Sequence, residues 1–178
     1  MAKKEAVFAG GCFWCTEAVF KMLRGVLVVE PGYTGGTVID PTYEQVSTGE
    51  TGHAEAIKFT YDPAVISYED LLNVFFATHD PTSLNRQGND VGTQYRSVIF
   101  YADETERKLA EKYISKLESE HPGGKPIVTT LEKLNKFYPA ENYHKDYFEN
   151  HSDEPYCQIV ITPKVEKAKK RFAELLKT

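Results

Sequence analysis

The first elements of the fold are set by residues 6–15, Ala6-Val7-Phe8-Ala9-Gly10-Gly11-Cys12-Phe13-Trp14-Cys15. Its first four residues form an apolar run typical of a short buried strand, and two glycines end that run. Helical character follows from about Phe13 to Leu23, where Gly25 stops it. Cys12 is therefore predicted at a turn between a strand and a helix.

The rest of the chain continues this alternation without an internal repeat or a long polar linker. Helices are predicted after Ser67, over 104–117 following Asp103, and over 165–176. Strands are predicted over 26–29, 54–61, 97–101, 127–131 and 158–162. This order predicts one α+β domain over residues 1–178. We expect a two-layer sandwich with a mixed, mainly antiparallel sheet covered by helices, a ferredoxin-like core with extensions.

Composition narrows the class of protein. The 26 acidic and 21 basic residues give a net charge of -5, and no block of lysine or arginine stands out, which argues against a nucleic-acid partner. The apolar run before Gly10 is too short for a signal peptide or a membrane span. We expect a soluble cytoplasmic monomer that binds neither membranes nor nucleic acid.

The chain has three cysteines, an odd number, which favours chemistry or metal binding over a disulfide framework.

Cys12 is the candidate reactive thiol. A thiol in the first turn of a helix faces unpaired backbone N–H groups and the positive end of the helix dipole, which favour the thiolate. Cys15 follows one helical turn later, and this spacing is used by dithiol redox motifs in which the second thiol resolves an intermediate on the first. Phe13 and Trp14 provide aromatic surface suited to a small apolar group. The alternative is that Cys12 is a buried small hydrophobe.

A Cys-x-x-Cys pair is also half of a zinc site. A structural zinc ion would need two further ligands. Neither Cys157 nor the histidines at 53, 79, 121, 144 and 151 supply a second pair at zinc-finger spacing. We therefore expect no metal site.

The tetrapeptide Gly11-Cys12-Phe13-Trp14 resembles the signature of the A-type peptide methionine sulfoxide reductases, and the resemblance extends along nearly the whole chain. Further segments that resemble this family's blocks, in the family's order, are Gly32-Tyr33-Thr34-Gly35-Gly36, Pro41-Thr42-Tyr43, Thr51-Gly52-His53-Ala54-Glu55, Gln87-Gly88-Asn89-Asp90, Gly92-Thr93-Gln94-Tyr95-Arg96-Ser97 and Ala140-Glu141-Asn142-Tyr143-His144.

The resemblance implies reduction of methionine sulfoxide, free or in a polypeptide, with a preference for the S epimer. The Cys12 thiolate would attack the sulfoxide sulfur, methionine would leave, and Cys12 would become a sulfenic acid. A sulfoxide oxygen leaves poorly unless it is protonated, and Glu55 matches the family's proton donor. Tyr43 and Tyr95 match tyrosines that hydrogen-bond the same oxygen.

The resemblance also implies a substrate pocket. Phe13 and Trp14 match the wall that receives the methyl group of the substrate, Asp90 matches an acidic residue nearby, and Tyr147 resembles another pocket residue. Each residue has a plainer alternative. Glu55 could be an exposed strand glutamate, Asp90 could stabilise a turn, and any one of 11 tyrosines could belong to the core or the surface.

Two cysteines compete for the resolving role. Many family members carry glycine at the position of Cys15 and keep a resolving cysteine near the C-terminus, where this chain has Cys157. Cys15 has the advantage of proximity, because only two residues separate it from Cys12. Cys157 precedes the predicted strand and would face the same apolar side as Ile159 and Ile161, as a buried structural thiol. We favour Cys15.

The resemblance names thioredoxin as the electron donor, replaceable by dithiothreitol in vitro, and no nucleotide-binding motif for a bound cofactor occurs in the chain. Two other functions compete. A dithiol-disulfide oxidoreductase would use Cys12 and Cys15 but would leave Glu55 without a role. A non-catalytic module that binds methionine-containing peptides or senses oxidants would bind without turnover.

Overall fold

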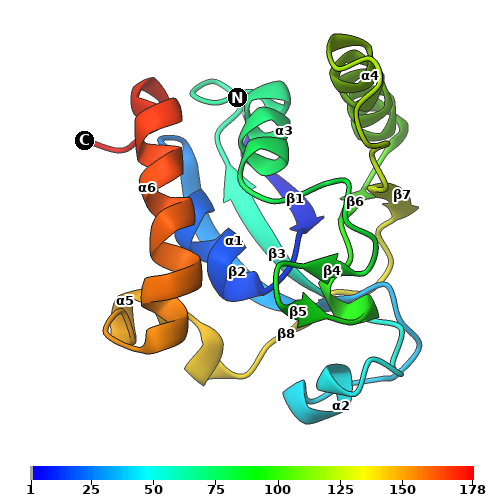
Figure 1. The fold of residues 1–178 in the computed structure, drawn as a ribbon, viewed down its shortest axis with the longest axis vertical. Helices are drawn as coiled ribbons and strands as arrows, with labels where there is room; N and C mark the ends of the chain where they lie inside the picture. Colours follow the sequence, from blue (N-terminus) through cyan, green and yellow to red (C-terminus); the bar gives the residue numbers. More distant parts are fainter. Residues whose placement is uncertain (1) are drawn as a thin grey trace.

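A six-stranded sheet forms the centre of the protein (Figure 1); the computed structural model describes residues 2–178. The strand order is β7-β6-β1-β3-β2-β8, in which only β6 and β7 are parallel, so the predicted mixed, mainly antiparallel sheet is confirmed. The sheet contains β1 (Lys4–Ala9), β2 (Val26–Thr34), β3 (Ala54–Tyr61), β6 (Val98–Tyr101), β7 (Thr130–Lys133) and β8 (Tyr138–Pro139). A separate hairpin pairs β4 (Arg86–Gln87) with β5 (Asp90–Val91).

Helices cover the sheet, as the two-layer prediction requires. In Figure 1, α1 lies across β2 and beside α6, and α4 stands at the edge near β6 and β7. None of the helices within residues 2–178 is long and apolar enough to cross a membrane. The α-helices are α1 (Phe13–Phe20), α2 (Tyr43–Ser47), α3 (Tyr68–Ala77), α4 (Glu104–Glu120), α5 (Tyr147–Asn150) and α6 (Thr162–Arg171).

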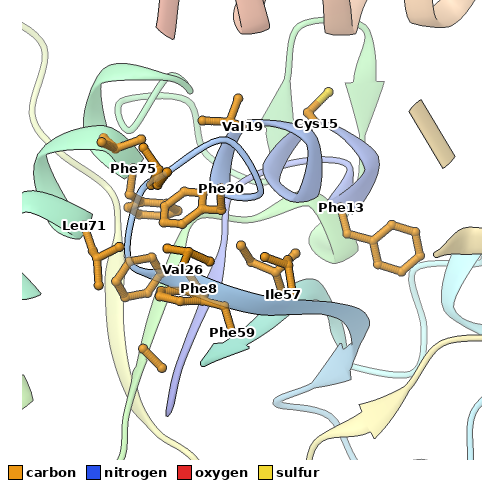
Figure 2. Close-up of a cluster of buried hydrophobic side chains, with 14 of the residues drawn as sticks. Phe8, Phe13, Cys15, Val19, Phe20, Val26, Ile57, Phe59, Leu71 and Phe75 are labelled. Atoms are coloured by element: carbon orange, nitrogen blue, oxygen red, sulfur yellow. The ribbon is translucent and has the colours of Figure 1, made fainter. Parts of the chain in front are cut away.

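Strand β1 is buried on both faces, which explains why its sequence is a continuous apolar run. Ala6 and Phe8 belong to the large core under the helices, whereas Val7 and Ala9 belong to a smaller cluster on the opposite face. Figure 2 shows Phe8 within the large core. Its ring lies 5.2 Å from that of Phe59, and burying such a side chain contributes about 1.5–3 kcal/mol. The strand thus anchors the turn that carries Cys12.

Two predicted helix starts are confirmed in atomic detail. The Ser67 hydroxyl accepts from the Asp70 backbone N–H, and the Asp70 carboxylate accepts from the Ser67 N–H, which completes a capping box at α3. Asp103 caps α4 by accepting from the Glu106 backbone N–H. These short-range signals need no tertiary contact, so sequence alone places them.

The predicted strand over 158–162 is wrong, because this segment is helical. Cys157–Ile161 forms a π-helical turn that leads into α6, with the Thr162 hydroxyl donating to the Cys157 carbonyl at 3.0 Å. Cys157 and Ile161 are buried while Ile159 is 73% exposed, and this four-residue spacing is that of a helix. A short apolar run fits either structure, and periodicity alone does not separate them.

Three predicted boundaries also move. The strand predicted over 26–29 continues to Thr34, and the strand predicted over 127–131 is observed at Thr130–Lys133. The last α-helix ends at Arg171, after which Ala173–Leu175 forms a 3-10 turn. In each case the ends of the element depend on partners elsewhere in the fold.

Candidate active site

Cys12 occupies the N-cap of α1, directly after β1, at the predicted turn between strand and helix. Its carbonyl accepts from the Cys15 backbone N–H at 3.1 Å, and its side chain is only 7% exposed. Gly11 has a φ of +87°, and a Cβ there would lie 2.8 Å from the Gln87 side chain. Glycine is therefore required at this position, because any larger residue would clash with Gln87 and disturb the turn that places Cys12.

Glu55 extends from β3 toward the N-terminus of α1. Its side chain is 1% exposed, and Oε1 accepts from the Phe13 backbone N–H at 3.2 Å. The other oxygen, Oε2, has no hydrogen-bond partner within residues 2–178. Burial raises the pKa of Glu55 to about 8, against the lowering effect of the Phe13 N–H. The carboxyl is therefore protonated at neutral pH, with Oε2 free to donate, and the alternative of an exposed glutamate is wrong.

The pKa of Cys12 does not follow the sequence-based expectation. Burial raises it well above the usual value, and the charges of Glu55 and Cys15 act in the same direction. Hydrogen bonds from the Trp14 backbone and the Tyr156 side chain oppose these effects but do not outweigh them. The predicted low-pKa thiol is thus wrong. The helix N-terminus supplies its N–H groups, but desolvation is the stronger effect.

Aromatic side chains pack around Trp14. Its indole Nε1–H donates to His144 Nδ1 at 3.0 Å, and its ring stacks on Tyr147 with 3.7 Å between centroids and 4° between planes. Phe13 is fully buried, and its ring centroid lies 6.4 Å from that of Tyr43. Figure 2 shows the Phe13 side chain pointing away from Phe8 of β1.

Tyr43 and Tyr95 both lie where the charges of Glu55 and Cys12 affect them. Burial raises the pKa of each phenol, followed by the charges of Glu55 and Cys12. Both tyrosines therefore remain protonated and can donate a hydrogen bond at neutral pH. Both phenols therefore lie in the same region of the structure as Cys12 and Glu55.

Glu141 fixes the position of Tyr43, and the sequence interpretation gave it no role. One carboxylate oxygen accepts from the Tyr43 backbone N–H at 2.9 Å, and the other accepts from the Tyr33 hydroxyl at 2.8 Å. Although burial acts to raise the pKa of Glu141, these hydrogen bonds hold it below its usual value. The residue lies within one of the quoted family-like segments, which is the only signal that could have identified it.

Asp90 reaches the site through a residue that sequence reasoning missed. The Tyr156 hydroxyl donates to Asp90 Oδ2 at 2.7 Å, and the Tyr156 side chain lies close enough to Cys12 and Cys15 to act on the pKa of both thiols. Tyr156 therefore joins β5 to both thiols of the Cys-x-x-Cys pair. In the sequence this tyrosine is noticeable only as the neighbour of Cys157.

All three cysteines are buried and unbonded. Burial raises the pKa of Cys15, while the charge of Lys164 and hydrogen bonds from Tyr156 and Lys164 lower it. Cys157 is 0% exposed and lies in the π-helical turn on the same side as Ile161. The predicted burial of Cys157 is confirmed, although its strand setting is not.

No group of three or more histidine, cysteine, aspartate or glutamate side chains within residues 2–178 is arranged to hold a metal ion. A cavity of about 620 Å³ lies beside α3 and α4, lined by Phe76, Tyr113 and Leu117 among others, and contains none of the predicted site residues.

The family model described as peptide methionine sulfoxide reductase matches residues 4–176. The peptide methionine sulfoxide reductase MsrA of Thermus thermophilus is 56% identical over 177 residues, covering 99% of each chain. Reduced Mxr1 from Saccharomyces cerevisiae is structurally similar with a TM-score of 0.81 and 34% identity, over 87% of this chain and 89% of that one. Mxr1 in complex with Trx2 is similar with a TM-score of 0.57 and 25% identity, over 82% and 84%.

Proposed function

The chain belongs to the peptide methionine sulfoxide reductase family and reduces methionine sulfoxide to methionine, and we propose that Cys12 and Glu55 carry out this reaction. The observation that carries the proposal is the buried, protonated carboxyl of Glu55, with Oε1 on the Phe13 N–H and Oε2 unpartnered. This carboxyl lies close enough to Cys12 for each group to affect the pKa of the other. A proton donor and a nucleophile are thus held next to each other.

In the first step, Glu55 donates its proton to the sulfoxide oxygen while the sulfur of Cys12 attacks the sulfoxide sulfur. The positive charge that develops on the protonated sulfoxide lowers the cost of removing the Cys12 proton, which passes to the Glu55 carboxylate. The oxygen then passes from the substrate sulfur to the Cys12 sulfur as the bond between the two sulfur atoms breaks, so methionine leaves as a thioether and Cys12 becomes a sulfenic acid. Glu55 ends protonated, and Cys12 has been oxidised by two electrons as the sulfoxide is reduced.

The substrate is held by the surrounding side chains. Phe13 and Trp14 receive its methyl group, and Tyr147 supports that wall by stacking on Trp14. The Tyr43 and Tyr95 hydroxyls donate to the sulfoxide oxygen and hold it where Glu55 can protonate it.

Asp90 acts through Tyr156, because its carboxylate accepts a hydrogen bond from the Tyr156 hydroxyl. Asp90 thereby holds the Tyr156 ring in place beside the two thiols.

Cys15 resolves the sulfenic acid. Its sulfur attacks the Cys12 sulfur, a Cys12–Cys15 disulfide forms, and the oxygen leaves as water. The proximity set by one helical turn and the nearby Lys164 charge both support this role. Cys157, fully buried within a helical turn, is the alternative resolving thiol and would have to leave the core to react.

A dithiol must then reopen the disulfide, and we propose thioredoxin as this partner, with no bound cofactor; the Mxr1 complex with Trx2 supports it. Residues 1–178 act as one catalytic domain of a cytoplasmic monomer that acts on the S epimer, free or in proteins.

An assay with reduced thioredoxin tests the proposed reaction. Thioredoxin should be oxidised only when methionine sulfoxide is added, and the protein should not catalyse reduction of insulin disulfides. Reduction of insulin at a comparable rate, with no dependence on the sulfoxide, would instead identify a dithiol-disulfide oxidoreductase.

A further inference from the structure

One face of α1 holds the segment that contains α5. Trp14, Glu17 and Lys21 are spaced three and four residues apart, so they lie along the same side of the helix. Lys21 forms ion pairs with Asp146 and Glu149, and its Nζ lies 2.7 Å from Glu149 Oε1. Glu17 lies between the residue that forms the substrate wall and this exposed ion pair.

Glu17 is a buried carboxyl that the proposed reaction does not use. Its side chain is 1% exposed, and Oε2 accepts from the Asp146 backbone N–H at 3.0 Å. The Tyr147 backbone N–H acts on the same carboxyl and, like the Asp146 N–H, lowers its pKa. Burial raises the pKa of Glu17 to about 7 despite these two donors. Burying a carboxyl is costly unless it is hydrogen-bonded, so both N–H groups are part of what keeps it there.

The Asp146 turn determines where Tyr147 begins. Asp146 has a φ of +56°, in the left-handed region, and Tyr147 is the first residue of α5. The Tyr147 ring is then stacked between Trp14 and His151, at 3.7 Å and 4.1 Å between centroids. A left-handed residue carries backbone strain that surrounding contacts must offset, and the Glu17 carboxylate provides such a contact.

We propose that Glu17 is a positioning residue, which holds the Asp146 turn so that Tyr147 keeps Trp14 in its orientation. Glu17 does not touch the substrate. Its effect passes through two backbone N–H groups and one ring stack to the indole. The expected consequence for substrate binding rests on the proposed function, in which Trp14 forms the wall for the methyl group.

The test uses the fluorescence of Trp14, which is the only tryptophan in the chain. The variants are Glu17→Leu, which removes the acceptor, and Glu17→Gln, whose single amide oxygen can accept from only one of the two N–H groups. Glu149→Gln is the matched control, because it loses an exposed Lys21 pair in the same segment. Circular dichroism and urea unfolding establish that each variant is folded.

In Glu17→Leu, we expect acrylamide quenching of Trp14 to increase severalfold and KM for methionine sulfoxide to rise about tenfold, with kcat within about twofold, because uniform binding is what the wall supplies. Glu17→Gln should show a rise in KM of about threefold and intermediate quenching. Glu149→Gln should match the wild type in both.

Unchanged quenching of Trp14 in folded Glu17→Leu would overturn the inference. If that variant does not fold, quenching in Glu17→Gln equal to that in Glu149→Gln would overturn it instead. Increased quenching with an unchanged KM would support the link from Glu17 to Trp14 and would refute the proposed role of Trp14 in substrate binding. The two failures are therefore distinguishable.

Discussion

Replacing Glu55 with glutamine should stabilise the protein at neutral pH while slowing its reaction. A glutamate in an unfolded chain has a pKa of about 4.3, whereas burial raises that of Glu55 to about 8. Between these values the folded chain keeps a proton that the unfolded chain releases. Stability from the protonated group is fully present below pH of about 4.3 and is lost as pH rises toward the folded pKa.

The size of this stability difference follows from the slope of the free energy of unfolding against pH. Each pH unit in that window lowers the free energy of unfolding by about 1.4 kcal/mol. Glu55→Gln has no such proton, so between pH 5.5 and 7.5 the wild type should lose about 3 kcal/mol relative to the variant. Glu17, whose pKa is raised to about 7, titrates in both proteins and cancels in the difference. Urea denaturation of both proteins at the two pH values measures it.

The kinetic effect of Glu55→Gln has the opposite sign. An amide does not donate an acidic proton, so single-turnover formation of methionine should slow by about 10²- to 10⁴-fold. In the wild type the active form is protonated, and the rate should fall about tenfold per pH unit above pH of about 8. The variant should lack that decline. Parallel stability profiles, or the same alkaline decline in both proteins, would refute the assignment of Glu55 as the buried acid.

Three further changes test other parts of the account. Cys15→Ser should form methionine in the first turnover at the wild-type rate but should not be recycled by thioredoxin; recycling at the wild-type rate would assign resolution to Cys157. Tyr95→Phe should slow the single-turnover step by about fivefold, the worth of a neutral hydrogen bond, and an unchanged rate would remove it from the site. Phe8→Ala should lower the free energy of unfolding in urea by about 3–5 kcal/mol, and a loss below about 1 kcal/mol would contradict its central place in the core.

Sequence predicted the parts of this protein that depend on neighbours in the chain. The capping box at Ser67 and Asp70 and the strand-glycine-cysteine-helix order around Cys12 are short-range patterns, and both are observed. The strand predicted over 158–162 was wrong because the prediction also used only local sequence, and that local pattern fits two structures. Its helical form follows from packing on α1 and from continuation into α6.

The electrostatics of the site could not be predicted in this way. Glu55 is buried because β3 places it under the N-terminus of α1, 42 residues away in sequence, and that burial is the main cause of its raised pKa. The same burial reverses the expected direction of the Cys12 pKa. His144 was missed because its partner Trp14 lies 130 residues earlier. A family resemblance can point to such residues, but their contacts exist only in the folded chain.

The central claim is that the Cys12 thiol reduces the sulfoxide and is itself oxidised. The direct measurement mixes reduced protein with each epimer of methionine sulfoxide in the absence of any reductant, counts the methionine formed, and maps the disulfide by peptide mass. We predict a single methionine per chain from the S epimer, none from the R epimer, and a Cys12–Cys15 disulfide. Formation of methionine by Cys12→Ser, or by wild-type protein whose Cys12 remains a free thiol, would contradict the account.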